Sequence, residues 1–275
     1  YSGDGAKWAE ATSSTLWSPR SDYAVAGFGG KLWVTGGYTL KNNVRKDRND
    51  VWRSYTGKVW QNAVGSAFWA PRSGHTMAVF NNSLWLMGGV NYSSSTLGYP
   101  AYLNDIWRSP NGVNWFKVTD TAPWQPRYGL KSLVFDNNLW IFGGIGAGGF
   151  RMPNYLSDVW RSSDGISWQL VAGTGPLSWI FYKPVANGSR MWILGSEYPF
   201  FEGLAHSANN AIWSSRDGAV WMKEAESSPW APRVGNGSLI FNNKAWILGG
   251  ISGYSQSPTS SCVNDVWYTP NLDNL

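Results

Sequence analysis

The sequence predicts an all-β protein built from five copies of one four-stranded antiparallel repeat. The 20 tryptophans fall into four classes of five, and the spacing within each class is 51 to 55 residues. Each repeat holds short runs of β-branched and aromatic residues separated by Asn, Asp or Gly turns, the pattern of strands joined by tight hairpins. No window shows a helical period of comparable strength. Four strands repeated about every 53 residues are typical of a β-propeller blade, so we predict a five-bladed β-propeller.

The first strand follows a Trp-x-Pro-Arg sequence in every repeat except the fourth, and a two-residue turn leads from it to the second strand. Asn and Gly tolerate the positive φ that such hairpin turns require. The predicted turns are Gly29-Gly30, Asn81-Asn82, Asn137-Asn138, Asn187-Gly188 and Asn242-Asn243. The second strand ends in two glycines in most repeats, which suits a bulge or a close backbone approach.

The third strand follows a loop of about 11–14 residues and carries an Asn-Asp-Val-Trp sequence or a variant of it. A Ser/Asp/Asn-Gly turn then leads to the fourth strand, which begins with Gly-x-x-Trp. Each aromatic side chain buries roughly 150–250 Å² between neighbouring sheets. We therefore expect nearly every tryptophan to have a structural role.

We predict a single domain over residues 1–275. The blades are expected at about 17–63, 69–118, 124–171, 179–224 and 230–269, together with a strand at 5–10. The sequence opens with a fourth strand and closes with a third strand, so residues 5–10 are predicted to complete the last blade and to remove its open edge.

The double glycine after the second strand and the tryptophan after the next loop resemble the kelch family over the whole chain. This resemblance implies the propeller fold and says little about function. The sequence departs from the family pattern because its tyrosine between the glycines and the tryptophan is not regularly placed. Five blades are also fewer than the six or seven that are common in such proteins.

Four arginines recur at the start of the innermost strand, and four aspartates recur one residue before the Val-Trp or Ile-Trp of the third strand. They are Arg20, Arg72, Arg127 and Arg233, and Asp50, Asp105, Asp158 and Asp265. The fourth repeat has Tyr182 and Ala211 at these positions. Their joint loss indicates that the two are partners in a buried, charge-assisted pair. A second interpretation is a channel mouth whose arginines bind an anionic ligand, as the kelch resemblance implies for carboxylates, and the two interpretations are compatible.

The long loops between second and third strands are expected on one face, together with the Trp-x-Pro-Arg loops, and a loop-rich face is the usual binding face. Aromatic side chains beside arginines and amides suit a glycan or a protein partner. The fourth repeat departs from the pattern and holds an aromatic segment that is either an interaction patch or a repacked blade. The candidate ligand-binding residues are Arg20, Arg72, Arg127, Arg233, Trp179, Tyr182, Tyr198, Phe200 and Phe201.

Composition narrows the function classes. The net charge of +5 is a mild excess for 275 residues, and the one dense basic run, 41–48, is interpreted as a solvated loop, so no nucleic-acid partner is expected. No apolar run approaches the roughly 18 residues of a membrane helix. Cys262 is the single cysteine, and the two histidines, His75 and His206, fall in different repeats. We therefore predict no metal site, no cofactor and no catalytic residue.

Four Asn-x-Ser/Thr sequons favour a secreted chain. Asn91 is the first expected glycosylation site, followed by Asn81 and Asn187, whereas Asn236 is expected to be unmodified. The sequence thus favours a secreted, non-enzymatic module that binds a glycan or a protein through its loop-rich face. A second hypothesis is an extracellular structural glycoprotein whose subunits exchange the closing strand and form fibres. A third is a mutarotase-like enzyme that acts on an acidic sugar.

Overall fold

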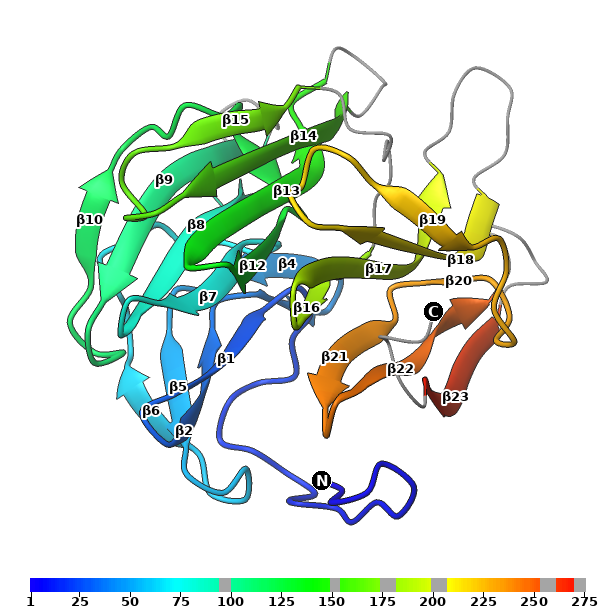
Figure 1. The fold of residues 1–275 in the computed structure, drawn as a ribbon. Helices are drawn as coiled ribbons and strands as arrows, with labels where there is room; N and C mark the ends of the chain where they lie inside the picture. Colours follow the sequence, from blue (N-terminus) through cyan, green and yellow to red (C-terminus); the bar gives the residue numbers. More distant parts are fainter. Residues whose placement is uncertain (94–99, 149–153, 174–181, 199–206, 253–260, 270–275) are drawn as a thin grey trace. The chain divides into compact units, whose positions relative to one another are not determined.

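The computed structural model describes residues 1–93, 100–148, 154–173, 182–198, 207–252 and 261–269, with the side chains of 196–198 and 207–208 left out. Every regular element in these ranges is a β-strand, and the strands form five antiparallel sheets and one small hairpin (Figure 1). The prediction of an all-β, five-bladed β-propeller is therefore confirmed. The described part contains no helix that could cross a membrane.

The first two sheets follow the predicted order of four consecutive strands. Sheet 1 consists of β1 (Ala24–Phe28), β2 (Lys31–Thr35), β5 (Val51–Ser54) and β6 (Gln61–Val64). Sheet 2 consists of β7 (Thr76–Phe80), β8 (Ser83–Asn91), β9 (Ala101–Ser109) and β10 (Phe116–Thr119). Between β2 and β5 the chain forms an additional hairpin, β3 (Tyr38–Lys41) and β4 (Val44–Asp47). The basic run at 41–48, predicted to be a loop, is thus partly a strand.

Sheet 4 repeats this plan, sheet 3 adds the short strand β11, and sheet 5 has the short strand β20 and the first three strands of the plan but no fourth among the described residues. Sheet 3 consists of β11 (Arg127–Tyr128), β12 (Lys131–Phe135), β13 (Asn138–Gly146), β14 (Asn154–Ser162) and β15 (Gln169–Ala172). Sheet 4 consists of β16 (Val185–Asn187), β17 (Arg190–Tyr198), β18 (Ser207–Ser215) and β19 (Met222–Ala225). Sheet 5 consists of β20 (Arg233–Val234), β21 (Gly237–Phe241), β22 (Lys244–Ser252) and β23 (Ser261–Tyr268).

The chain divides into two compact units. The first comprises residues 1–132, 145–154 and 162–168, and the second comprises 133–144, 155–161 and 169–275. Sheets 1 and 2 belong to the first unit and sheets 4 and 5 to the second, while the boundary runs through the strands of sheet 3. The assignment of the chain to a single domain stays a prediction.

The turns between first and second strands have the predicted backbone conformation, with one shift. Asn81 and Asn82 have φ of 45° and 51°, as a primed hairpin turn requires. In sheet 3 the residues with positive φ are Asp136 and Asn137, so the predicted turn at Asn137-Asn138 lies one residue too late. In sheet 4 only Gly188 of the predicted pair has positive φ.

Residues 5–10, predicted as the closing strand of the last sheet, adopt a turn instead. Ser2 accepts a hydrogen bond from the Gly5 amide, and Asp4 accepts from the amides of residues 6 and 7. The backbones of Tyr1 and Ala9 pair with each other. These contacts satisfy the polar groups of the segment locally. Among the described residues β23 pairs only with β22, and its Val266 is 36% exposed where Val51 and Ile106, the corresponding residues of sheets 1 and 2, are fully buried.

Tryptophans form the core between neighbouring sheets within each compact unit. One buried cluster in the first unit joins Trp33 of sheet 1 to Trp69, Trp107 and Trp115 of sheet 2. The Trp33 ring packs directly on Gly112, because an added Cβ at this glycine would lie 2.3 Å from the ring. The same relation links Trp85 with Gly165 and Trp140 with Gly218. The glycine of each of these Gly-x-x-Trp turns is therefore required by the tryptophan of the preceding sheet as well as by its positive φ.

Candidate functional site

The predicted arginine–aspartate pairs are present in three sheets. Arg72 donates from Nη1 and Nη2 to the two carboxylate oxygens of Asp105, at 2.6 and 2.7 Å. Arg20 and Asp50 form the same bidentate pair at 2.6 and 2.9 Å, and Arg233 pairs with Asp265 in the same way. The interpretation of these residues as partners is confirmed for these three sheets; the pairs of sheets 1 and 2 are buried, whereas in sheet 5 Arg233 is buried and the side chain of Asp265 is 39% exposed.

Each pair also explains two further features of the repeat. Nη1 of Arg72 donates to the carbonyl of Gly88, the first residue of the double glycine, at 2.9 Å. The indole N–H of Trp107 donates to the same Asp105 carboxylate at 2.7 Å. Burial acts to raise the pKa of Asp105, but the hydrogen bonds and charge of Arg72 outweigh it and hold this pKa below its ordinary value. In sheet 4, Ala211 offers no carboxylate to the indole of Trp213.

The remaining predicted ligand contacts lie in two kinds of environment. Arg127 and Tyr182 are buried, as are Arg72 and Arg233, so none of these side chains forms part of the exposed surface. Trp179, Phe200 and Phe201 lie outside the described residues, and Tyr198 is described only as the last residue of β17. A role of these residues in ligand binding stays a prediction.

The sequons differ in accessibility. Asn91, the first glycosylation site expected from the sequence, ends β8 with only 5% of its surface exposed, and its side chain accepts a hydrogen bond from the Ser93 amide. Asn81 is exposed in a hairpin turn, whereas Asn187 is half-buried and Asn236 is buried. Asn81 is therefore the sequon whose side chain the structure leaves most accessible.

His75 is buried, with 6% of its surface exposed. It contacts Thr35 at 2.9 Å from Nε2, and its ring lies 6.2 Å from that of Trp69. Burial, together with the charge of Arg72, lowers the pKa of His75 to about 3. The neutral ring is thus a core residue. No group of three or more metal-ligating side chains occurs among the described residues, and Cys262 is an exposed thiol in β23.

A cluster of tyrosines around one arginine is the most distinctive surface group of the first compact unit. The guanidinium of Arg45 lies 3.8 Å from the ring centroids of both Tyr38 and Tyr92, a double cation–π contact. The rings of Tyr102 and Tyr128 lie 5.8 Å apart, and burial together with the nearby Tyr92 raises the pKa of Tyr102. We call Tyr38, Arg45, Tyr92, Tyr102 and Tyr128 the tyrosine–arginine cluster.

Buried hydrogen bonds hold the cluster in place. Asp47 has a fully buried side chain and accepts from the Ser73 hydroxyl at 2.9 Å and from the Tyr92 amide at 2.6 Å. Arg45 donates to the same Ser73 at 2.6 Å. The hairpin of β3 and β4 is thereby anchored to sheet 2, so Arg45 is a pre-oriented cation and not a mobile side chain.

The end of this hairpin projects apolar and basic side chains. Leu40 and Val44 are 64% and 67% exposed, and Lys41 and Lys46 are exposed beside them. Asn42 and Asn43 form the turn with positive φ. We call residues 40–44 the β3–β4 tip. Its composition of apolar residues among cations is that of a surface which contacts another macromolecule.

The sequence alone does not reveal this site, because a basic run is ordinarily interpreted as a solvated loop. One signal is present: Leu40 and Val44 lie on either side of a segment that contains an Asn-Asn pair, which is a hairpin pattern. The pairing of Arg45 with tyrosines from two different blades depends on tertiary packing and has no local signature. By contrast, three of the tryptophans expected beside the binding loops, Trp69, Trp124 and Trp230, are at most 3% exposed, and Trp17 is half-buried.

Comparison with known proteins places the chain among repeat proteins. No family model matches. The chain is 25% identical over 260 residues to human Kelch-like protein 25, which covers 91% of this chain and 40% of that protein. It is 25% identical over 232 residues to human Host cell factor 2, which covers 72% of this chain and 28% of that protein. The chain thus spans less than half the length of these curated relatives.

A solved structure described as "Structure of YjhT" has the same fold. It aligns with a TM-score of 0.70 and 16% identity, over 94% of this chain and 84% of that chain. Sequence identity at this level shows the fold alone.

Proposed function

Because the chain belongs to the kelch-repeat β-propellers, we propose that it is an interaction module that binds an acidic segment of a protein partner. The contact surface is the tyrosine–arginine cluster together with the β3–β4 tip. The observation that carries this proposal is Arg45, held at 3.8 Å from two tyrosine rings and anchored beside a buried carboxylate. Tyrosine and arginine are among the residue types enriched where protein interfaces gain most of their affinity.

The charge of this surface favours an acidic partner. Lys41, Arg45 and Lys46 lie on one hairpin, and the only carboxylate of this hairpin, Asp47, is buried and accepts hydrogen bonds from three groups. The chain as a whole carries a net charge of +5. Such a surface accelerates encounter with acidic partners, and this effect weakens as salt increases.

A protein partner is favoured over a glycan by the burial of the tryptophans. The predicted sugar contacts combine ring stacking with arginine donors, but Trp69, Trp124 and Trp230 are enclosed and Arg72 is bound to Asp105. The exposed aromatic side chain of the cluster, Tyr92, is 40% accessible and already stacks on Arg45.

The test is binding of fluorescent 12-residue peptides that contain four glutamates and two leucines, with glutamine replacing glutamate in the matched neutral set. The full chain is expected to bind the acidic set more tightly, with an affinity that falls as salt rises. Arg45→Gln should weaken this binding about 10-fold or more, since a charge-assisted contact is worth about 1.5–3 kcal/mol. Lys7→Gln, which removes an exposed cation far from the hairpin in sequence, is the matched control and should leave the affinity unchanged. Equal binding of acidic and neutral peptides would refute the proposal.

Secretion, fibre formation and sugar chemistry each have a separate test. If the chain passes through a secretory pathway, the intact mass should show a glycan that is lost in Asn81→Gln, because Asn81 is the accessible sequon. A particle mass of 30.5 kDa in solution, that of a monomer, would exclude the hypothesis that the chain forms fibres. Turnover of an acidic sugar would support the mutarotase-like enzyme, although Arg72, Arg127 and Arg233 are buried.

A further inference from the structure

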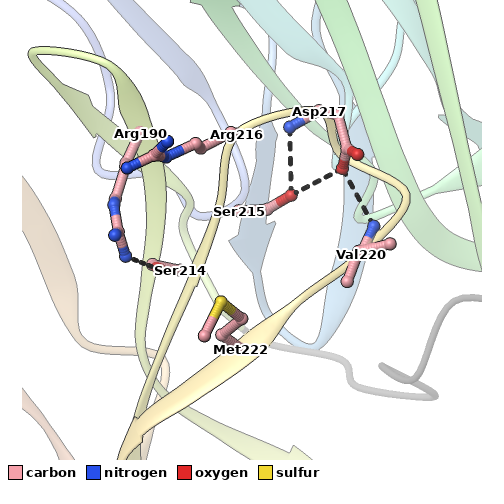
Figure 2. Close-up of a pocket in the computed structure, with 7 residues that line it drawn as sticks. All are labelled: Arg190, Ser214, Ser215, Arg216, Asp217, Val220 and Met222. Carbon is pink, nitrogen blue, oxygen red and sulfur yellow. Dashed lines mark hydrogen bonds between the residues drawn. The ribbon is translucent and has the colours of Figure 1, made fainter.

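Sheet 4 contains a cavity at the hairpin between β18 and β19. It measures about 320 Å³ and is lined by Arg190, Ser214, Ser215, Arg216, Asp217, Val220 and Met222 (Figure 2). All seven residues belong to the second compact unit. They come from the start of β17, the end of β18, the turn that follows it and the start of β19.

The cavity lies where one arginine of the repeat is replaced by serine. Sheets 1 to 3 carry Arg53, Arg108 and Arg161 directly after the tryptophan of the third strand, where sheet 4 carries Ser214. In sheet 2 this arginine lies over the second-strand tryptophan, with Arg108 at 5.7 Å from Trp85. Arg108 also donates to Ser83 of the second strand at 2.9 Å. In sheet 4 the two residue types are exchanged, because the arginine lies on the second strand and the serine on the third.

Arg190 is the cation that sheet 4 uses instead. Its guanidinium lies 5.9 Å from the Trp192 ring, and its Nη1 donates to Ser214 at 2.8 Å and to Glu224 at 2.5 Å. In the part of the chain that the structure describes, Nε and Nη2 of Arg190 have no protein acceptor. The salt bridge thus orients the guanidinium while leaving donors for a further oxygen ligand.

Arg216 supplies a second cation. It is exposed in the turn between β18 and β19 and makes no ion pair or hydrogen bond with any described residue. The carboxylate of the neighbouring Asp217 is committed to the turn, since it accepts from the amides of Ala219 and Val220, both at 2.9 Å. The Val220 amide, opposed by burial and aided by the Ala219 amide, lowers the pKa of Asp217. Oδ1 of Asp217 is thus held by the turn, and among the described residues this carboxylate forms no ion pair with Arg216.

The remaining wall is apolar. Val220 and Met222 line the cavity and are 66% and 60% exposed, as are the corresponding Val59 of sheet 1 (69%) and Phe116 of sheet 2 (60%). A ligand that covers them gains free energy from the apolar surface removed from water. The combination of two arginines with an apolar wall selects a ligand with both features.

We propose that this cavity binds an organic monocarboxylate with a small apolar body, such as the carboxyl end of a peptide that terminates in leucine. The carboxylate contacts Arg190 and Arg216, and the apolar body packs on Val220 and Met222. This site is independent of the tyrosine–arginine cluster, which lies in the first compact unit.

The test is a titration of the full chain with N-acetyl-leucine, followed by the NMR signals of the Met222 and Val220 methyl groups. The neutral analogue N-acetyl-leucinamide and inorganic phosphate are titrated in parallel. We expect saturable shifts with a dissociation constant of about 1 mM, which corresponds to about −4 kcal/mol, and at least about 5-fold weaker binding of the amide and of phosphate, since each lacks one of the two features. Equal binding of the amide would exclude recognition of the carboxylate, and equal binding of phosphate would exclude the apolar wall.

Variants distinguish a loss of ligand binding from a loss of folded structure. Ser214→Arg restores the residue that sheets 1 to 3 carry and should fill the cavity and abolish binding without loss of folded structure. Arg216→Gln should weaken binding about 10-fold or more, as loss of one charge-assisted contact implies. Lys244→Gln removes the cation that sheet 5 carries at the position of Arg190 and is the matched control, with unchanged affinity expected. Retention of binding in Ser214→Arg, with an intact thermal transition, would overturn the proposal.

Discussion

Removal of one carboxylate from a buried pair should destabilise the protein more than removal of the whole pair. In Asp105→Ala the Arg72 guanidinium, whose side chain is 0% exposed, loses both carboxylate contacts and keeps only the carbonyls of Ala70 and Gly88. An uncompensated buried charge costs about 3–5 kcal/mol. The indole of Trp107 also loses its acceptor, which costs about 1 kcal/mol or more.

The sum is about 4–6 kcal/mol, a large part of the roughly 5–15 kcal/mol by which domains are stable. Sheet 4 supplies the matched comparison, because it carries Tyr182 and Ala211 at the two positions and both are buried. The double variant Arg72→Tyr, Asp105→Ala reproduces this arrangement in sheet 2 and leaves neither charge of the pair. It should be more stable than Asp105→Ala by about 2 kcal/mol, as expected for coupled neighbours.

The assay is urea unfolding near neutral pH, monitored by tryptophan fluorescence and by circular dichroism to test whether the transition is two-state. The single variants Asp105→Ala and Arg72→Tyr complete the cycle. If the double variant is as unstable as the sum of the two single variants, the residues are not coupled and the buried-pair interpretation of the repeat fails.

Three further predictions concern different parts of the structure. In urea unfolding, Gly112→Ala should destabilise the protein by more than about 2 kcal/mol beyond Gly129→Ala. Both glycines have positive φ, but only at Gly112 would the added Cβ lie 2.3 Å from a ring, that of Trp33. Equal losses of stability would mean that the Trp33 ring moves to accommodate the methyl group. His75 should make the free energy of unfolding decrease as the pH falls. Its pKa of about 3 in the folded state lies below the ordinary value of 6.5, so the unfolded state binds the proton first as acid is added. The stabilisation is therefore complete above pH 6.5 and is lost by about pH 3, a loss on the order of 5 kcal/mol. His75→Gln should flatten the pH profile of unfolding between these limits, and an unchanged slope would contradict the assignment. The hydrogen bonds of Arg233 lower the pKa of Asp265 from 3.8 to about 2. Ionised Asp265 should therefore stabilise the folded protein above pH 3.8, and this stabilisation should be lost as the pH falls towards 2. The difference in the free energy of unfolding between the wild type and Asp265→Asn, followed across this pH range, measures the contribution.

The repeat makes most of the fold predictable. The four tryptophan classes identify five sheets, and the joint absence of arginine and aspartate from the fourth repeat identifies Arg72 and Asp105 as partners. These features recur because each is set by contacts within one blade or between neighbours. The turn of sheet 3 is predicted one residue too late because Asp136 and Asn138 are both acceptable turn residues, and only packing decides between them.

The candidate site is less predictable for a physical reason. Arg45 contacts tyrosines from two blades and a serine from the second of them, and no spacing in the sequence reports such a meeting. The accessibility of Asn91 is wrongly predicted in a similar way, since β8 extends to residue 91 and buries the side chain. Irregular features that belong to one blade depend on long-range packing, whereas the repeat reveals only what all blades share.

The packing of an indole ring on the glycine of the next blade determines which fragments of this protein can keep their stabilising contacts. A blade excised alone would expose its own tryptophan and leave its glycine without a ring, so most of its stabilising contacts belong to junctions and not to the blade itself. Insertion or exchange of a single blade would therefore require two junctions to match. The smallest fragment that keeps one complete junction is a consecutive pair, such as the blades that contain Trp33 and Gly112.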